Sequence, residues 1–242
     1  DSIPPLDIGY AHYGGIYRDV WLIATDPVHF DMLDHGSPGV FVDTPGVSRE
    51  SSKVRVRTTV VNDGEKDRNL TVRTELLDTD HRLVTRLDSA VSVKKGERAA
   101  VEQQSESILT PHLWTPDDPY LYRVETTIRE GDVILDCVQS HLGFRWFKFD
   151  PDQGFFLNGE KLTLRGASRH QDVEGFGSAV PDWAHRRDLE WLKRMGANFL
   201  RLAHYPQEQE VLDTADRLGL IVWEEIPIVS IMSTSPEFAQ TC

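Results

Sequence analysis

Cysteine is almost absent from this sequence. The 242 residues include only Cys137 and Cys242, and no C-x-x-C pair occurs. A zinc ribbon or a disulfide framework needs more cysteines at closer spacing. The sequence therefore supports neither, although a single disulfide between the two cysteines stays open.

Long apolar runs and positive charge are also scarce. No stretch approaches the ~18 consecutive apolar residues of a membrane-spanning helix. The chain has 26 Lys and Arg against 39 Asp and Glu, which gives a net charge of −13. Such an acidic surface repels phosphate backbones and anionic lipids, so we expect neither nucleic acid nor a membrane as a partner.

Several signatures of metal and cofactor enzymes are missing. The nine histidines form no H-E-x-x-H and no H-x-H, and the glycines form no G-x-G-x-x-G dinucleotide loop. No G-x-S-x-G elbow of a serine hydrolase occurs either. We therefore predict no metal site and no cofactor.

Composition and hydrophobic periodicity divide the chain into three segments. Residues 1–25 are aromatic and rich in glycine, and residues 16–23 read as one β-strand that needs a pairing partner. Residues 26–143 alternate apolar and polar side chains with a period of two and contain no helical pattern. This spacing of short strands predicts an immunoglobulin-like β-sandwich, without the Cys…Trp…Cys hallmark of antibody domains.

From residue 144 the period changes to that of an α/β fold. The expected order is strand, helix, strand, helix, strand over residues 161–165, 182–195, 197–202, 208–218 and 220–225. Asp182 is a candidate N-cap, and Gly196 and Gly219 are stop signals. This order calls for parallel strands, as in a doubly wound sheet or a (β/α)8 TIM barrel. A full barrel needs about 250 residues, so residues 144–242 are expected to be a truncated, N-terminal part of one.

Polar side chains follow each of the three expected parallel strands. In such folds functional groups sit at the carboxyl ends of the strands, and a pocket lined this way suits the hydroxyls of a sugar. The alternative is that each residue simply lies on a solvated rim. The candidates are Ser168, Arg169, His170, Gln171, Asp172, Arg201, His204, Tyr205, Glu224 and Glu225.

Glu224 and Glu225 invite comparison with the carboxylate pair of a glycosidase. Retaining enzymes need two carboxyl groups about 5 Å apart. Neighbouring residues of a strand point to opposite faces, so at most one of the two can line the pocket. We expect a structural role for the pair.

Four stretches then resemble glycoside hydrolase family 2. Residues 14–20 (GGIYRDV) are similar to the last strand of its sugar-binding jelly-roll domain, and residues 113–122 to the end of its immunoglobulin-like domain. Residues 156–170 are similar to the entry of its barrel. Residues 198–206 (NFLRLAHYP), with Asp216 and residues 219–223, are similar to its first signature, although a small residue is usual at Leu202. The resemblance covers nearly the whole chain and implies domains at residues 1–25, 26–143 and 144–242.

The resemblance also implies a reaction. Residues 169–172 (RHQD) and 223–227 (WEEIP) look most like the β-galactosidase branch, with β-glucuronidase as the rival. The implied enzyme is a retaining exo-glycosidase that hydrolyses terminal β-D-galactosides, with a β-linked glycoside or oligosaccharide as its partner. A homo-oligomer stays open, as does the choice between bacterial cytoplasm and periplasm.

Roles carry over from the family by position. Asp7, His170, Asp172 and His204 correspond to substrate-binding residues, and Arg201 to the arginine that orients the nucleophile. Val229 and Ile231 stand where large β-galactosidases bind magnesium, so that site is not expected. No Asn-Glu dipeptide occurs, which puts both the acid/base and the nucleophilic Glu outside this chain and predicts an inactive fragment. A non-catalytic carbohydrate-binding sandwich, or a barrel completed by another chain, remain alternatives.

Overall fold

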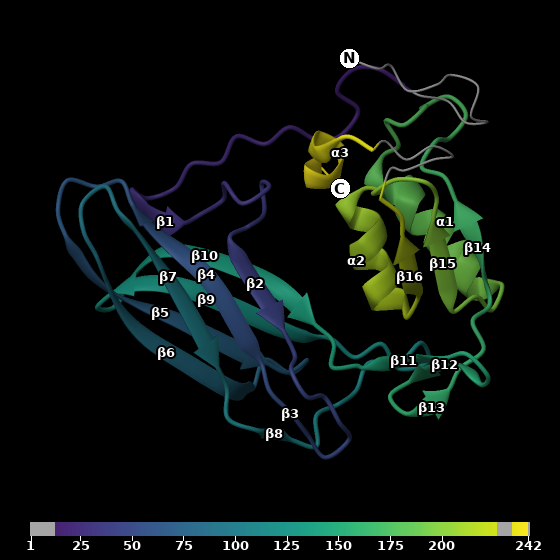
Figure 1. Ribbon diagram of the computed structural model, residues 1–242, viewed down its shortest axis with the longest axis horizontal. Coiled ribbons are helices and arrows are strands. Elements are labelled where there is room, and N and C mark those ends of the chain that lie inside the picture. The colour runs from purple at the N-terminus through teal and green to yellow at the C-terminus, as the bar shows by residue number, and fades with distance from the viewer. Residues whose placement is uncertain (1–12, 227–233, 242) are drawn as a thin grey trace. The chain divides into compact units, whose positions relative to one another are not determined.

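The computed structural model describes residues 13–226 and 234–241 (Figure 1). The chain forms two compact units. One, here called the sandwich unit, comprises residues 22–115 and 119–162. The other, the α/β unit, comprises residues 1–21, 116–118 and 163–242.

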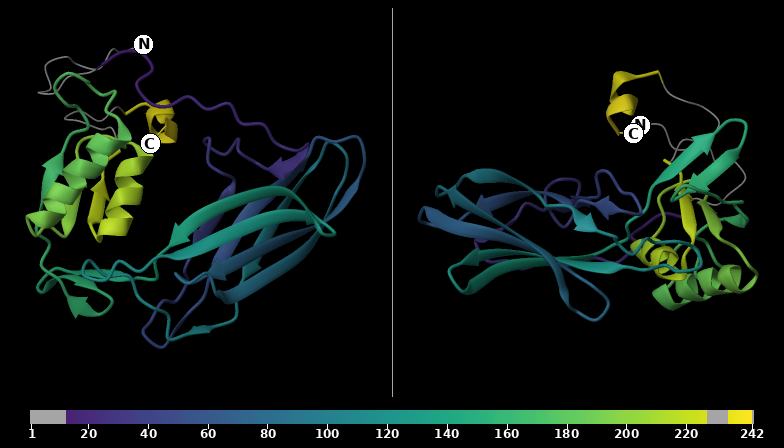
Figure 2. Two further views of the ribbon diagram at one scale, coloured as in Figure 1. Left: turned by 180° about the vertical axis from the view of Figure 1, so that it is seen from behind. Right: turned by 90° about the horizontal axis from the view of Figure 1, so that it is seen from below.

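The sandwich unit is built on two antiparallel sheets, which Figure 2 shows as separate layers. In the first sheet β4 (Arg55–Asn62) pairs with β1 (Val28–Phe30), β2 (Val40–Asp43) and β7 (Arg98–Gln104). The second sheet has the order β10-β9-β5-β6, formed by Val133–Leu142, Tyr122–Glu130, Arg68–Leu77 and Leu83–Val93. The predicted all-β segment is thus confirmed within the described residues.

The core of the sandwich lies between these sheets. Phe30 and Val60 from the first sheet and Val72 and Ile128 from the second are fully buried in one cluster. Phe30 and Val72 alternate with more exposed neighbours along their strands, as the period-two pattern predicts, whereas Val60 and Ile128 each lie in a run of three buried residues. Burial of both inner faces is what holds two such sheets together.

Smaller antiparallel pairings complete this unit. β3 (Ser51–Ser52) pairs with β8 (Ile108–Leu109), and β11 (Phe147–Asp150), β12 (Gly154–Leu157) and β13 (Glu160–Lys161) form a three-stranded sheet. The predicted turn at Asn158 and Gly159 is confirmed, since both have positive φ (52° and 82°), the conformation of a tight hairpin turn. The Asn158 side chain donates to the carbonyl of the buried Trp114 at 2.9 Å.

The α/β unit holds a parallel sheet of order β14-β15-β16, formed by Gly166–Arg169, Phe199–Leu202 and Ile221–Glu224. α1 (Asp182–Arg194) and α2 (Gln209–Leu218) connect these strands, and their apolar sides share a core with Leu200 and Leu202. Figure 1 shows the two helices beside the sheet. A short helix, α3, spans Pro236–Thr241. The described strands form no closed barrel.

The helix ends follow the sequence signals in part. Gly219 ends α2 in the left-handed conformation (φ 73°), as the pattern predicts, and Glu208, expected as the first helical residue, is the N-cap. The prediction of Asp182 as the N-cap of α1 was wrong. Pro181 occupies that position, without a side-chain cap hydrogen bond, and Asp182 is the first helical residue. A carboxylate there still favours the positive end of the helix dipole.

Two predicted strands are not where the sequence pattern put them. Residues 16–23 form no strand, which agrees with the rule that a strand needs a partner. The first parallel strand is Gly166–Arg169 and not residues 161–165. A Cβ at position 166 would lie 1.8 Å from the Phe199 carbonyl oxygen, so the close approach of β14 to β15 requires glycine.

The remaining expectations are only partly covered by the described residues. Asp7, Val229, Ile231 and Cys242 lie outside them. The jelly-roll assignment and the three domain limits stay predictions. None of the helices in the described ranges has the length and apolarity to cross a lipid bilayer.

Candidate functional site

The register of the parallel sheet brings three strand ends to one edge. Arg169, Leu202 and Glu224 are the last residues of their strands and are paired in register across the sheet. The residues that follow therefore emerge side by side. His170, His204 and Glu225 come from these three ends, and with Arg201 and Tyr205 we call them the strand-end cluster.

Arg201 and Glu225 form the charged centre of the cluster. Arg201 Nε donates to Glu225 Oε1 at 2.6 Å, and its Nη1 donates to Ser168 Oγ at 3.1 Å. Ser168 is the register partner of Arg201 on β14. The guanidinium is thus fixed between two strands, and the fork geometry of arginine suits this double contact.

Glu225 also fixes the ring of His204. Its Oε2 lies 2.8 Å from His204 Nδ1, so a neutral imidazole donates its proton there and carries the lone pair on Nε2. Partial burial raises the pKa of Glu225, but the hydrogen bonds from His204 and Arg201 outweigh it and hold that pKa below its ordinary value. The carboxylate is therefore ionised at neutral pH.

His170 lies against His204 on the same edge. The two ring centroids are 5.2 Å apart with the planes at 74°. His170 Nδ1 is 3.3 Å from the Tyr205 hydroxyl, which also accepts from the Gln171 backbone N–H at 3.4 Å. Tyr205 therefore links the loop after β14 to the loop after β15.

The buried side chain of Arg169 links the loop after β15 to α1. The Arg169 guanidinium donates to Gln207 at 2.8 Å and to Asp188 at 3.0 Å, and lies 2.9 Å from His185 Nδ1. Burial lowers the pKa of His185, and the neighbouring charge of Arg169 lowers it further, so this ring is neutral. Gln207 in turn donates to the Arg169 carbonyl at 2.6 Å.

The adjacent carboxylates Glu224 and Glu225 take different partners, as alternation along a strand predicts. Glu224 Oε1 accepts from the Gln207 backbone N–H at 3.2 Å, whereas Glu225 faces Arg201 and His204. Both were among the strand-end candidates of the sequence analysis, which expected at most one to line the pocket and favoured a structural role for the pair; the contacts of Glu225 place it in the strand-end cluster. Its position directly after β16 was the signal.

The other predicted site residues are placed less centrally. Asp172 is exposed, and no hydrogen bond joins it to the cluster among the described residues. Asp7 lies outside the described ranges. Arg18 was missed altogether, although it reaches Gln171 and Pro206 at 3.4 and 2.5 Å.

The chemistry of the cluster is that of a hydroxyl-binding site. Two imidazoles, a phenol and a charge-paired arginine offer both donors and acceptors at one edge. Among residues 13–226 and 234–241, no three His, Cys, Asp or Glu side chains are grouped so as to hold a metal ion.

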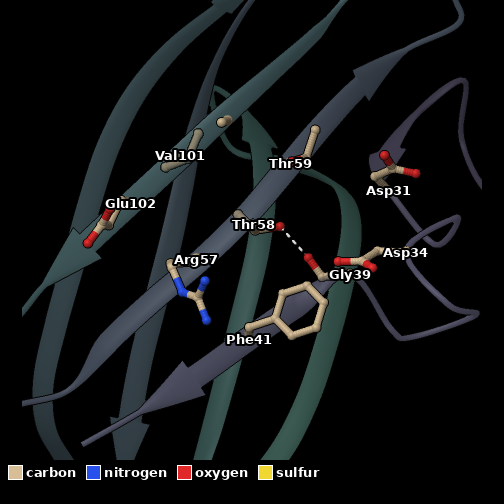
Figure 3. Close-up of a pocket in the computed structure, with 10 residues that line it drawn as sticks. Asp31, Asp34, Gly39, Phe41, Arg57, Thr58, Thr59, Val101 and Glu102 are labelled. Carbon is tan, nitrogen blue, oxygen red and sulfur yellow. Dashed lines mark hydrogen bonds between the residues drawn. The ribbon is translucent and has the colours of Figure 1, made fainter. Parts of the chain in front are cut away.

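The sandwich unit carries a groove on its surface. It is an open groove of about 400 Å³ along β2, β4 and β7, and Figure 3 shows Phe41, Arg57 and Glu102 on its walls. The Thr58 hydroxyl donates to the Gly39 carbonyl at 2.6 Å in its floor. None of the predicted site residues lines this groove.

Comparison with known families gives a consistent result. Residues 38–145 match the family described as Glycosyl hydrolases family 2, and residues 151–241 match the TIM barrel domain of the same family.

Individual relatives agree. A β-glucuronidase of Bacteroides fragilis is 38% identical over 230 residues, covering 94% of this chain and 32% of the relative. The β-galactosidase BoGH2A of Bacteroides ovatus is 36% identical over 211 residues, covering 87% of this chain and 24% of the relative. The crystal structure of a Bacteroides uniformis β-glucuronidase has a TM-score of 0.94 at 43% identity, covering 99% of this chain and 29% of that one. The chain thus spans about a quarter to a third of the length of these relatives.

Proposed function

This chain belongs to glycosyl hydrolase family 2, and from that premise we propose that the protein carrying it is a retaining β-glycosidase that removes a terminal, non-reducing sugar. The observation that carries the proposal is the strand-end cluster, in which His170, Arg201, His204 and Glu225 meet at the carboxyl edge of the parallel sheet. That edge is where barrel enzymes bind their substrates.

The cluster binds the sugar in this proposal and does not cleave it. His170 and His204 hydrogen-bond ring hydroxyls, Asp7 and Asp172 add carboxylates, and Arg201 orients the nucleophile. Retaining hydrolysis needs two carboxyl groups about 5–5.5 Å apart. In the strand-end cluster Glu225 is the single carboxylate, and it is already bonded to Arg201 and His204.

The acid/base and the nucleophile are therefore assigned to other parts of the protein. One carboxylate attacks the anomeric carbon while the other protonates the leaving oxygen and then activates water. For the same reason we expect the 242-residue chain alone to show no turnover.

For the sugar, we propose a β-glucuronide first. This choice rests on the 43% and 38% identity to β-glucuronidases of two Bacteroides species. A β-galactoside is the second candidate, supported by the 36% identity to a β-galactosidase and by the match of residues 169–172 to that branch. The two sugars differ in the group attached to C5, a carboxylate in one and a hydroxymethyl group in the other, and in the configuration of the hydroxyl at C4.

The test compares two chromogenic substrates on the full-length protein. We expect a higher kcat/KM for p-nitrophenyl β-D-glucuronide than for p-nitrophenyl β-D-galactoside. The reverse ratio would favour the second candidate, and hydrolysis of neither above the blank would reject the proposal.

A variant pair links the activity to the cluster. His204→Ala removes a hydrogen bond to the sugar and should lower kcat/KM by about 10- to 100-fold, the cost of a bond of 1–3 kcal/mol. The matched control is His81→Ala, at an exposed turn of the sandwich unit, which should leave kcat/KM unchanged. Equal kinetics of both variants would remove His204 from the site.

A further inference from the structure

Arg18 lies in the segment before the sandwich unit, and its side chain contacts residues far along the chain in the α/β unit, to which residues 1–21 also belong. Its Nη2 donates to the Pro206 carbonyl at 2.5 Å and lies 3.4 Å from Gln171 Oε1. Its Nε lies 3.5 Å from Glu208 Oε2. The guanidinium of Arg18 therefore bridges the loop after β14 and the loop after β15. Its partners in these loops, Gln171 and Pro206, are 153 and 188 residues away in sequence.

These two loops carry the histidines of the strand-end cluster. Gln171 directly follows His170, and Pro206 is two residues after His204. Tyr205, which lies between His204 and Pro206 in the sequence, contacts His170 Nδ1 and the Gln171 backbone N–H. A shift of either loop would therefore move one imidazole relative to the other.

The segment around Arg18 has a second attachment to the same region. The ring of Tyr13 lies over Gly177, where an added Cβ would come within 3.0 Å of it. Gly177 belongs to the connection between β14 and α1. By contrast Ile16 and Val20 are 84% and 77% exposed, so the described contacts are concentrated on Tyr13 and Arg18.

The partners of Arg18 explain why arginine stands there. A carbonyl, a side-chain amide oxygen and a carboxylate lie in different directions, and the planar fork of a guanidinium presents its N–H groups to several acceptors at once. A lysine carries the same charge but a single compact head. The loss of Arg18 also leaves Glu208 without this cation, at the N-cap of α2.

We propose that Arg18 is a positioning residue that locks the loops after β14 and β15 and so holds His170 and His204 in their mutual orientation. The proposal deepens the proposed function and rests on it for its kinetic consequence. It gives the segment of residues 13–18 a role in the active site.

The experiment uses the full-length protein with Arg18→Ala, Arg18→Lys and the matched control Arg86→Ala. Arg86 is a similarly exposed arginine, paired with Glu75 on the sandwich unit. Hydrogen exchange of residues 170–177 and 203–208 is measured without substrate, together with kcat and KM for the better of the two aryl glycosides. A displacement of catalytic groups by 1 Å can lower the reaction rate about 100-fold.

We expect Arg18→Ala to accelerate exchange in both loops and to lower kcat/KM by about tenfold, mainly through kcat, with Arg18→Lys in between. Arg86→Ala should change neither. In a double-mutant cycle, Gln171→Ala should add little to Arg18→Ala, because both act through one loop.

Unchanged loop exchange in Arg18→Ala overturns the proposal, and so does a kcat/KM within twofold of the control in an active protein. The exchange arm needs no turnover. It therefore tests Arg18 even if the protein hydrolyses neither glycoside, in which case the proposed function fails separately.

Discussion

At the scale of single residues, Glu225 fixes the ring of His204, the residue to which the proposed function assigns a sugar hydroxyl. It accepts from His204 Nδ1 at 2.8 Å and from Arg201 Nε at 2.6 Å. A neutral His204 that donates from Nδ1 to this carboxylate has its acceptor on Nε2, and the proposed function assigns that atom to a sugar hydroxyl. In the proposed function, the histidine that binds the sugar thus depends on a residue that need not touch the sugar.

We predict that Glu225→Gln lowers kcat/KM by about 10- to 100-fold, since an amide provides one acceptor oxygen where the carboxylate provides two and leaves the Arg201 charge unpaired. The matched control is Glu75→Gln, which removes an ion pair with Arg86 on the sandwich unit and should leave kcat/KM unchanged. The measurement is steady-state kinetics of the full-length protein on an aryl β-glycoside.

The same prediction has a pH signature. The pKa of Glu225 is depressed in the folded protein, so its contribution is present above the ordinary value of about 4.3 and is lost as the pH falls through the lowered value. Because kcat/KM is a property of the folded protein, the gap between the parent and Glu225→Gln should be widest near neutral pH and should close only as the pH falls through the lowered pKa. A gap that widens on acidification would contradict the assigned charge state.

Sequence reasoning reached part of this site. His170, Arg201 and His204 were predicted from their places at successive strand ends, and the structure brings these three together. Arg18 gave no such signal, because its partners are more than 150 residues away and follow no period. Contacts of this kind depend on the tertiary fold, which pattern and propensity do not encode.

At the scale of secondary-structure elements, the two glycines after α1 and α2 are a natural pair for comparison. Gly196 and Gly219 both have positive φ, 88° and 73°. A Cβ on Gly196 meets nothing within 4 Å, whereas a Cβ on Gly219 would lie 2.3 Å from the Pro116 carbonyl oxygen. The first glycine is needed for its conformation alone, and the second for its conformation and for space.

We predict that Gly196→Ala costs about 1–2 kcal/mol of unfolding free energy, the cost of the left-handed conformation, and that Gly219→Ala costs clearly more. Urea denaturation of the full-length variants, followed by tryptophan fluorescence, measures both. Equal costs would mean that the backbone near Pro116 moves away without penalty.

The elements also show where sequence patterns are reliable. The helices ending at Gly196 and Gly219 were predicted within one or two residues, because caps and periodicity act locally. The first parallel strand was predicted five residues too early, because the pattern of residues 161–165 does not show which residues pair with β15. The lack of a side chain at Gly166 is what admits the Phe199 carbonyl, and this reason appears only when both strands are in place.

At the scale of the whole molecule, the two units differ in the extent of their described cores, because the sandwich unit holds two clusters of buried apolar residues and the α/β unit holds one. The sandwich unit closes two sheets over a core that includes Phe30, Val72 and Ile128, each 0% exposed. Its buried Gln103 is satisfied as well, since it accepts from Thr74 at 2.7 Å and donates to the Val72 carbonyl at 2.9 Å. In the α/β unit Trp183, Trp191 and Trp223 remain 52%, 53% and 57% exposed.

This contrast predicts different behaviour of the two units as separate polypeptides. Residues 22–162 should unfold in urea in one cooperative transition, because the core lies within that span. Ile128→Ala should lower the stability of this fragment by about 2–5 kcal/mol, the cost of truncating a buried isoleucine, whereas Lys94→Ala on its exposed surface should not.

Residues 163–242 should bind a hydrophobic dye and unfold without a sharp transition, since large tryptophan surfaces face solvent. A cooperative transition in the shorter fragment would mean that its three strands and helices form a sufficient core on their own. The loss of cooperativity in the longer fragment would mean that the sandwich draws stability from outside its own two sheets.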